Sequence, residues 1–295
     1  MNPSDTFAGA TAVRPDPDVA GRWRADIPPG WSSPGGIHGG VLAATVLRAV
    51  RDAVDDPGLR LRSAHVSFRS PPTDPALVID VEIARRGGIT AHVDATARGE
   101  GQDAPSTVIT TLFTRNKLED SYLDAVYPPV PGPDECVSWQ GASDAFDGPT
   151  VARPPVFDHL DMRSADGGDD YSGPGSPIGR RAYAIRWAQY RVPVADGSGW
   201  IDPLMLVPIS DFPGVAVWSR YRRDEPFSFV TSLEFEIHFL EDPTDEWIMG
   251  EVRSRWMGDG YAWTETDLWS GGRLVGISTQ MMLLRPQTAP PPGPR

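Results

Sequence analysis

Two stretches of this chain repeat the same order of predicted elements, and that repeat limits the possible folds more than any other feature. Residues 20–117 and 180–286 each begin with a strand candidate, continue with one apolar segment and end in strands of alternating pattern. The two stretches keep a common offset, because Phe68 lies 171 positions before Phe239. Matched order and spacing predict a duplicated unit of about 100 residues. The alternative is a pair of unrelated α+β domains.

Within each stretch the apolar pattern changes from helical to alternating. The segment Val41–Val50 is apolar around most of its circumference, which is typical of a buried helix rather than a surface helix. Further along, Ala64, Val66 and Phe68 alternate with polar residues, and this period of two predicts antiparallel strands joined by short turns. Each half is therefore expected to be α+β, with one long central helix wrapped by one antiparallel sheet.

The second apolar segment, Trp200–Phe212, contains two prolines with different expected effects. Pro203 lies near its first turn, where proline is favourable because the missing N–H has no intrahelical partner to lose. Pro208 lies inside the segment, and we expect it to kink or shorten the helix.

Three regions show no period and define the boundaries of the two halves. Residues 1–19 are predicted to form a flexible N-terminus, and residues 287–295 a flexible Pro-rich tail. Residues 118–179 are rich in Asp, Gly and Pro, and we interpret them as a linker with short ordered pieces such as Val156–Met162. The linker separates an N-terminal half, 20–117, from a C-terminal half, 180–286.

Charge and cysteine content exclude several classes of partner. The formal net charge is −13 and the isoelectric point is near 4.8, whereas nucleic acids and anionic membranes require a basic surface. No apolar run is long enough for a signal peptide or a membrane span. Cys136 is the only cysteine, so no intrachain disulfide can form. We therefore expect a cytoplasmic protein with neither nucleic acid nor membrane as its partner.

Common catalytic motifs are missing from the sequence. It contains no G-x-S-x-G nucleophile elbow and neither of the glycine-rich loops that bind dinucleotides or nucleotide phosphates. Its five histidines show no metal-ligand spacing, so we expect no zinc site. The sequence therefore predicts an activity that needs neither a metal nor another cofactor.

His38, Gly39 and Gly40 immediately precede the first apolar segment. Glycines permit a close approach of the backbone, and the first N–H groups of a helix have no intrahelical partner, so they can receive an oxyanion. These three residues are therefore candidates for substrate binding. An equally supported interpretation is a glycine turn that lets the helix pack tightly, and the two interpretations are compatible.

Four segments resemble a known family. Ile37–Ala44 resembles the start of the central helix in hotdog-fold thioesterases, and three later segments are similar to the second half of the type II acyl-CoA thioesterases, which are double hotdogs: Ser232–Leu240, Asp267–Val275 and Ser278–Arg285. The resemblance implies a duplicated hotdog that hydrolyses acyl-CoA or a related acyl thioester with directly activated water. It also implies a homo-oligomer.

The resemblance also suggests where catalysis takes place. Single-hotdog thioesterases have an acid nine positions after the helix-start histidine, but that position is Leu47 here, so the first half lacks the acid. Asp211 matches the water-binding aspartate of the type II enzymes, Gln280 their glutamine, and Ser232 falls where they have threonine. Simple alternation instead favours Thr231 as the hydroxyl donor, and that choice stays open. The alternative for Asp211 is a surface acid at a helix end.

Two other functions remain open at this point. One is a different hotdog enzyme acting on acyl thioesters, such as a dehydratase or a pathway-specific enzyme, although the sequence has no D-x-N-x-x-H-like pattern. The other is a non-catalytic acyl-CoA-binding protein whose site is altered by Pro208 and Ser232.

Overall fold

A computed structural model describes residues 2–115, 122–138, 154–165, 182–212, 214–218 and 228–286. Much of the predicted linker and the whole predicted tail, 287–295, lie outside these residues. Among the described helices, none combines the length and the hydrophobicity that crossing a membrane requires.

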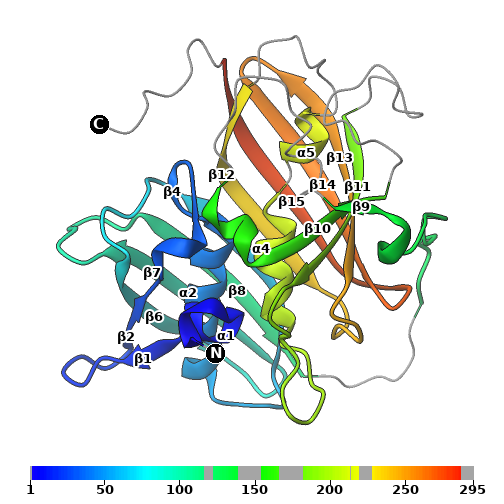
Figure 1. Cartoon of the computed structure of the whole chain (residues 1–295). Helices are drawn as coiled ribbons and strands as arrows, with labels where there is room; N and C mark the ends of the chain where they lie inside the picture. The colour runs from blue at the N-terminus through cyan, green and yellow to red at the C-terminus, as the bar shows by residue number, and fades with distance from the viewer. Residues whose placement is uncertain are drawn as a thin grey trace.

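A single antiparallel sheet dominates the described part of the chain (Figure 1). Its N-terminal strands are β1 (Val13–Pro15), β2 (Arg22–Asp26), β5 (Arg60–Phe68), β6 (Ala76–Arg86), β7 (Thr90–Gly99) and β8 (Thr107–Thr114). Its C-terminal strands are β9 (Val137–Ser138), β10 (Leu160–Ser164), β11 (Tyr183–Tyr190), β12 (Ser228–Phe239), β13 (Ile248–Gly258), β14 (Tyr261–Ser270) and β15 (Arg273–Pro286). A separate short hairpin joins β3 (Ser32–Ser33) to β4 (Gly36–Ile37).

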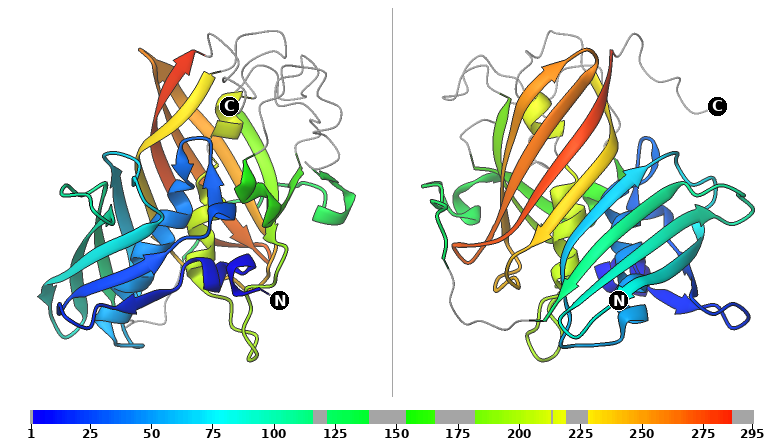
Figure 2. Two further views of the ribbon diagram at one scale, coloured as in Figure 1. Left: turned by 60° about the vertical axis from the view of Figure 1, so that its left-hand side comes forward. Right: turned by 180° about the vertical axis from the view of Figure 1, so that it is seen from behind.

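The strand order is symmetric about the centre of the sheet: β1-β2-β6-β7-β8-β5 on one side and β12-β15-β14-β13-β11-β10-β9 on the other. The halves meet where β5 pairs with β12, with Val66 opposite Phe235 and Ala64 opposite Ile237. All four of these side chains are buried, so the seam lies inside the core. The sheet curves around helices on both sides of the seam (Figure 2).

Helix α2 (Gly39–Val54) fills the concave face of the N-terminal half. Its apolar side chains are buried on nearly every side, as for Val41, Leu47 and Val50, so the predicted buried helix is confirmed. The helix ends where Asp55 adopts the left-handed conformation, with φ of 46°. Near this end Arg51 donates two hydrogen bonds to the buried carboxylate of Asp202, which fastens α2 to the C-terminal half.

The described residues of the C-terminal half do not form the long helix that we expected. A 3-10 turn, η6 (Pro203–Met205), leads into the short helix α4 (Leu206–Ser210), and a separate helix, α5 (Gly214–Trp218), follows. Pro203 lies in the first turn, as predicted. The helix ends at Ser210, two residues after Pro208, and Asp211 adopts a non-helical conformation. The proline at position 213 of the sequence disfavours helical geometry in Phe212, the residue before it, which favours an end at this point.

The prediction of a flexible N-terminus at residues 1–19 is wrong for the described residues. Helices η1 (Pro3–Asp5) and α1 (Phe7–Ala10) precede β1, which pairs with β2. Phe7 and Thr11 are buried, and Thr11 accepts hydrogen bonds from the guanidinium of Arg48 on α2. The burial of one aromatic ring and one satisfied hydroxyl orders a segment that has no periodic pattern.

Parts of the predicted linker, 118–179, also belong to the folded structure. Strands β9 and β10 extend the sheet beyond β11, and two 3-10 turns precede them, η3 (Pro133–Glu135) and η5 (Pro155–Asp158). Trp187 donates a hydrogen bond to the carbonyl of Pro131, and Tyr127 packs edge-on against Trp269. These contacts place residues 125–136 over the outer face of the C-terminal sheet.

Candidate active site

Three of the predicted site residues meet in one buried cluster, although they come from three separate elements. Asp211 follows the end of α4, Ser232 lies on β12 and Gln280 lies on the neighbouring strand β15. Asp211 Oδ1 accepts hydrogen bonds from Gln280 Nε2 at 2.7 Å and from Ser232 Oγ at 3.2 Å. Gln280 Nε2 also contacts Ser232 Oγ. The Asp211 side chain is only 6% exposed, so it is not a surface acid.

Ser232 rather than Thr231 reaches the carboxylate, and a β-bulge explains why. The pairing of β12 with β15 shifts between Ser232 and Glu234, which leaves Leu233 as an extra residue. A bulge interrupts the strict alternation of side chains, so a count of two along the strand assigns Thr231 to the wrong face. The prediction based on alternation failed for this local reason.

The second carboxylate oxygen of Asp211 connects the cluster to the start of α2. Asp211 Oδ2 accepts a hydrogen bond from the backbone N–H of Gly40 at 2.6 Å, across 171 positions of sequence. A carboxylate at a helix start is stabilised by the unpaired N–H groups and by the helix dipole. His38 is the N-cap residue but its side chain makes no capping bond, so Asp211 supplies a cap from the other half.

The two glycines are required by tight packing between α2 and α4. A Cβ atom at Gly40 would lie 2.6 Å from Cα of Pro208 and 2.9 Å from Cβ of Asp211. A Cβ atom at Gly39 would lie 2.8 Å from Asp211 Oδ2. The packing interpretation of this glycine pair is thus supported by the geometry, and the same geometry brings the backbone up to the carboxylate.

His38 forms an uncharged wall of the site. Its ring is buried and lies 4.8 Å from the ring of Phe212, and its Nε2 is 3.7 Å from Asp211 Oδ2. Burial lowers the pKa of His38 below 6.5, although the Asp211 charge and a hydrogen bond with the Asp211 backbone oppose this shift. Nδ1 is buried without a hydrogen-bond partner among the described residues. A neutral imidazole fits these surroundings, because the cationic form would bury an unpaired N–H.

Gln280 contributes an acceptor as well as a donor. The residue is 3% exposed, and Oε1 is buried without a partner among the residues described here. Its NH₂ group is committed to Asp211 and Ser232, so the amide orientation leaves Oε1 free for a proton donor. Together the carboxylate, the hydroxyl and the amide oxygen can hold one water molecule.

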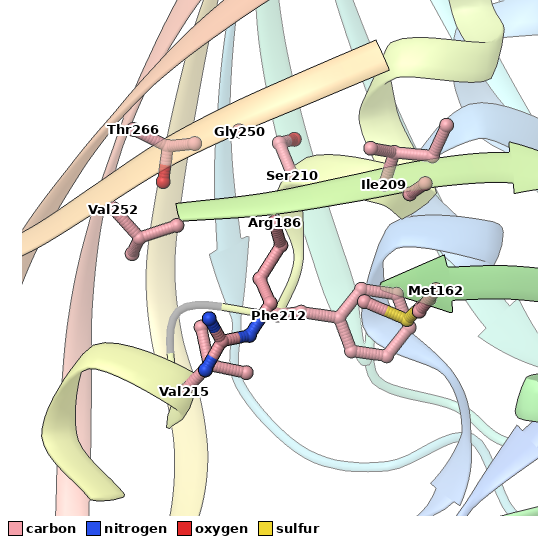
Figure 3. A pocket seen from close by; sticks show the side chains of 10 residues that line it. Met162, Arg186, Ile209, Ser210, Phe212, Val215, Gly250, Val252 and Thr266 are labelled. Atoms are coloured by element: carbon pink, nitrogen blue, oxygen red, sulfur yellow. The ribbon is translucent and has the colours of Figure 1, made fainter. Parts of the chain in front are cut away.

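Sequence reasoning missed a second group of residues close to this cluster. A cavity beyond Phe212 is lined by side chains from α4 and α5 and from strands β11, β13 and β14 (Figure 3). Its polar lining includes Arg186, Ser210 and Thr266, all of which are buried. The available signal was a single charged residue, Arg186, inside the mostly apolar strand Tyr183–Tyr190.

Solved structures share this fold at low sequence identity. A hotdog-fold protein of unknown function from Alicyclobacillus acidocaldarius superposes with a TM-score of 0.78 at 22% identity, covering 95% of this chain and 97% of that chain. Acyl-CoA thioesterase II TesB2 from Mycobacterium marinum gives 0.72 at 22% identity, over 96% and 99%. The dehydratase domain of RzxB from Pseudomonas fluorescens gives 0.56 at 12% identity, over 90% and 94%. No curated protein sequence matches the chain significantly.

The fold defines a hotdog-fold protein. Sequence models of two acyl-CoA thioesterase domains narrow this class further. The N-terminal domain model matches residues 27–115, and the C-terminal domain model matches residues 133–284. The chain therefore belongs to the acyl-CoA thioesterase family, and it is a thioester hydrolase.

Proposed function

We propose that Asp211, Ser232 and Gln280 hold the water that hydrolyses the thioester, with acyl-CoA as the substrate. The observation that carries this assignment is the convergence of the three side chains in one buried cluster, with Gln280 Oε1 unpaired. A structural hydrogen-bond network would satisfy that oxygen, since buried polar atoms are nearly always paired. A water molecule that donates to both Asp211 and Gln280 accounts for it.

In the proposed reaction, Asp211 accepts a proton from this water as the water oxygen attacks the thioester carbonyl carbon. The carbon–sulfur bond then breaks, and the thiol of CoA leaves as a thiolate because its pKa is near 8.5. The proton on Asp211 passes to this thiolate, which gives the free thiol and restores the carboxylate. Because the Gly40 N–H is bonded to Asp211 Oδ2, the neighbouring N–H of Gly39 at the start of α2 is the proposed donor to the oxyanion. Ser232 and Gln280 hold the water and the Asp211 carboxylate in the orientation that the attack on the carbonyl carbon requires. The products are a carboxylic acid and free CoA.

We also propose that the chain is a duplicated hotdog, with halves at 20–117 and 180–286 and part of the intervening segment added to the sheet edge. The mirrored strand order about the β5–β12 pair supports this proposal. The inward-facing residues of β7 and β14 support it further: Ala91, Val93, Ala95 and Ala97 precede Ala262, Thr264, Thr266 and Leu268 by 171 positions each.

A cytoplasmic location and a homo-oligomeric state complete the proposal. The single cysteine, Cys136, which leaves no possibility of an intrachain disulfide, supports the first. The family resemblance supports the second, since hotdog sheets commonly pair.

The decisive test is the variant Asp211→Asn, which removes the charge while keeping the shape. We expect kcat for an acyl-CoA that the native enzyme hydrolyses to fall by about 10²–10⁴, the usual contribution of a general base. KM should change little, because the lost interaction acts mainly in the transition state. Free thiol release measures both constants. The matched control is Glu234→Gln, an exposed acid two positions from Ser232, which should keep native turnover. If Asp211→Asn kept the native turnover, Asp211 would not be the general base.

A further inference from the structure

A buried threonine lies next to the cluster of Asp211, Ser232 and Gln280. Thr264 is on β14, where it is directly opposite Gln280 in the pairing with β15. It is 1% exposed, and its Oγ1 has no hydrogen-bond partner among the described residues. Directly opposite residues of antiparallel strands point to the same face of the sheet, with Cβ atoms about 4.5–5.5 Å apart. Thr264 Oγ1 and Gln280 Oε1, both unpaired, therefore belong to neighbouring buried side chains.

The matching pair in the N-terminal half has its hydroxyl satisfied. Val93 precedes Thr264 by 171 positions and lies opposite Thr111 on β8. The Thr111 hydroxyl donates to the Val93 carbonyl at 2.8 Å. Valine and threonine have nearly the same shape, so the threonine of the C-terminal half adds a hydroxyl without improving the packing, and a buried hydroxyl lowers stability unless it is paired. Of the two matched pairs, the one with unpaired oxygens is the one beside the Asp211 carboxylate.

The three side chains of the cluster leave the proposed catalytic water without a hydrogen-bond donor. Ser232 has one O–H group, which donates to Asp211. The NH₂ group of Gln280 donates to Asp211 and to Ser232. The groups that remain for a water molecule, the Asp211 carboxylate and Gln280 Oε1, are both acceptors. A buried water molecule makes about three hydrogen bonds, so the site still needs a donor to the water oxygen.

We propose that the Thr264 hydroxyl is this donor and that Thr264 positions the water for attack. The inference extends the water site of Asp211, Ser232 and Gln280, so it rests on the proposed function. The water gives one hydrogen to Asp211 and the other to Gln280 Oε1, which leaves two lone pairs on its oxygen. Thr264 binds one lone pair, so only the other can point at the thioester carbonyl carbon. Thr264 takes up no proton in the reaction; it fixes the direction of the attack.

The position of the water is the direct test. A crystal structure of the native enzyme that resolves ordered water should show one water molecule within hydrogen-bond distance of the Asp211 carboxylate, Gln280 Oε1 and Thr264 Oγ1. In crystals of Thr264→Val, that water should be absent or displaced. A water molecule that contacts Asp211 and Gln280 but not Thr264 would overturn the inference and leave the proposed function intact.

Steady-state kinetics of Thr264→Val test the role in catalysis. We expect kcat for an acyl-CoA that the native enzyme hydrolyses to fall about tenfold, the contribution of one hydrogen bond. KM should stay near the native value, because the lost contact is to the water and not to the substrate. Thr264→Ser keeps the hydroxyl and should restore most of kcat. Native kcat in Thr264→Val, or a loss that serine does not restore, would contradict the positioning role.

The melting temperature separates this role from a purely structural one. Thr264→Val removes a hydroxyl that has no partner among the described residues, so Tm should equal the native value or exceed it. A structural hydroxyl predicts the opposite, a lower Tm with native kcat. The matched control is Thr111→Val on β8, which loses the buried hydrogen bond to the Val93 carbonyl. The control should lower Tm and leave kcat unchanged.

Asp211→Asn distinguishes failure of this inference from failure of the proposed function. If Asp211→Asn loses turnover while Thr264→Val does not, the inference fails alone. If Asp211→Asn keeps native turnover, the proposed function fails and the inference falls with it. Because both residues act on one water molecule, the double variant should lose less than the product of the two single losses. Losses that multiply in full would assign Thr264 to a different step and refute its contact with the water.

Discussion

At Asp211 one carboxylate serves two purposes through its two oxygens. Oδ2 caps α2 through the N–H of Gly40, and Oδ1 faces Gln280 and Ser232. The cap fixes the orientation of the carboxylate, so Oδ1, the oxygen that we propose acts on the water, is held in place before substrate binds. Holding a catalytic group in advance reduces the reorganisation needed in the transition state.

The assignment of the hydroxyl contact to Ser232 predicts that alanine variants of Ser232 and of its neighbour Thr231 differ in kcat. Ser232→Ala removes a hydrogen bond to the Asp211 carboxylate, so we expect kcat to fall about 10- to 100-fold. Thr231→Ala should leave kcat near the native value, because the bulge gives the contact to Ser232. Steady-state kinetics on one acyl-CoA compares the two variants. A larger loss in Thr231→Ala would show that the strand keeps simple alternation in the working enzyme.

The lowered pKa of His38 predicts a pH dependence of stability. As pH falls below 6.5, the unfolded chain protonates this histidine while the folded chain, where burial disfavours the charge, does not. Stability that is present above pH 6.5 is therefore lost as the pH falls toward the lower folded pKa. We expect Tm to decline less between pH 7.5 and 5.5 in His38→Gln than in the native protein.

Melting curves of the exposed-site variant His65→Gln provide the reference for this measurement. That control should show the native decline. Parallel declines in His38→Gln and the native protein would mean that His38 does not titrate differently on folding.

At the scale of elements, the site exists because the start of one helix packs on the end of another. Helices α2 and α4 come within van der Waals contact at Gly40, opposite the backbone of Val207 and Pro208. The stop in the second helix after Ser210 is what turns Asp211 out of helical geometry and toward α2. If α4 continued as a regular helix beyond Ser210, the Asp211 side chain would rotate about the helix axis and away from the start of α2.

Gly40→Ala tests this contact. The added Cβ would lie 2.6 Å from backbone Cα of Pro208, and a backbone atom cannot rotate away. We expect a loss of about 1–3 kcal/mol in the free energy of unfolding from overpacking, together with reduced kcat because Asp211 must shift. Chemical denaturation measures the first effect. Gly35→Ala is the control, since nothing lies within 4 Å of a Cβ there; equal stability of the two variants would contradict the close packing.

At the scale of the whole molecule, the two halves share one core. The largest buried apolar cluster combines side chains from α2 with others from α4 and β12, such as Leu47, Leu206 and Ile237. The sheet is continuous across β5 and β12, and the Arg51–Asp202 contact links the halves at the other end of α2. Each half therefore depends on the other for burial of its helix.

This shared core predicts a single cooperative unfolding transition. Leu47→Ala, in the N-terminal half, should cost about 2–5 kcal/mol and shift the whole transition. Tryptophan fluorescence, which comes mainly from residues 180–286, should move together with far-ultraviolet circular dichroism. Two separate transitions, of which only one responds to Leu47→Ala, would show that the halves unfold independently.

The sequence by itself determined the features that have a local cause: helix α2, the alternating strands, and the shortening of the second helix that Pro208 predicted. Resemblance added the names of Asp211, Ser232 and Gln280. Only the tertiary structure decided how they meet. No periodic pattern in the sequence indicates a contact across 171 positions, a bulge after Ser232 or a hydrogen bond to Gly40. The same holds for the N-terminal segment, whose order comes from the burial of Phe7 and Thr11. It also holds for Arg186, because only the fold shows that this residue lines a buried cavity. The periodicity of a sequence shows which side of a helix or strand is buried. A functional site depends on which other elements pack against that side, and only the tertiary structure shows this.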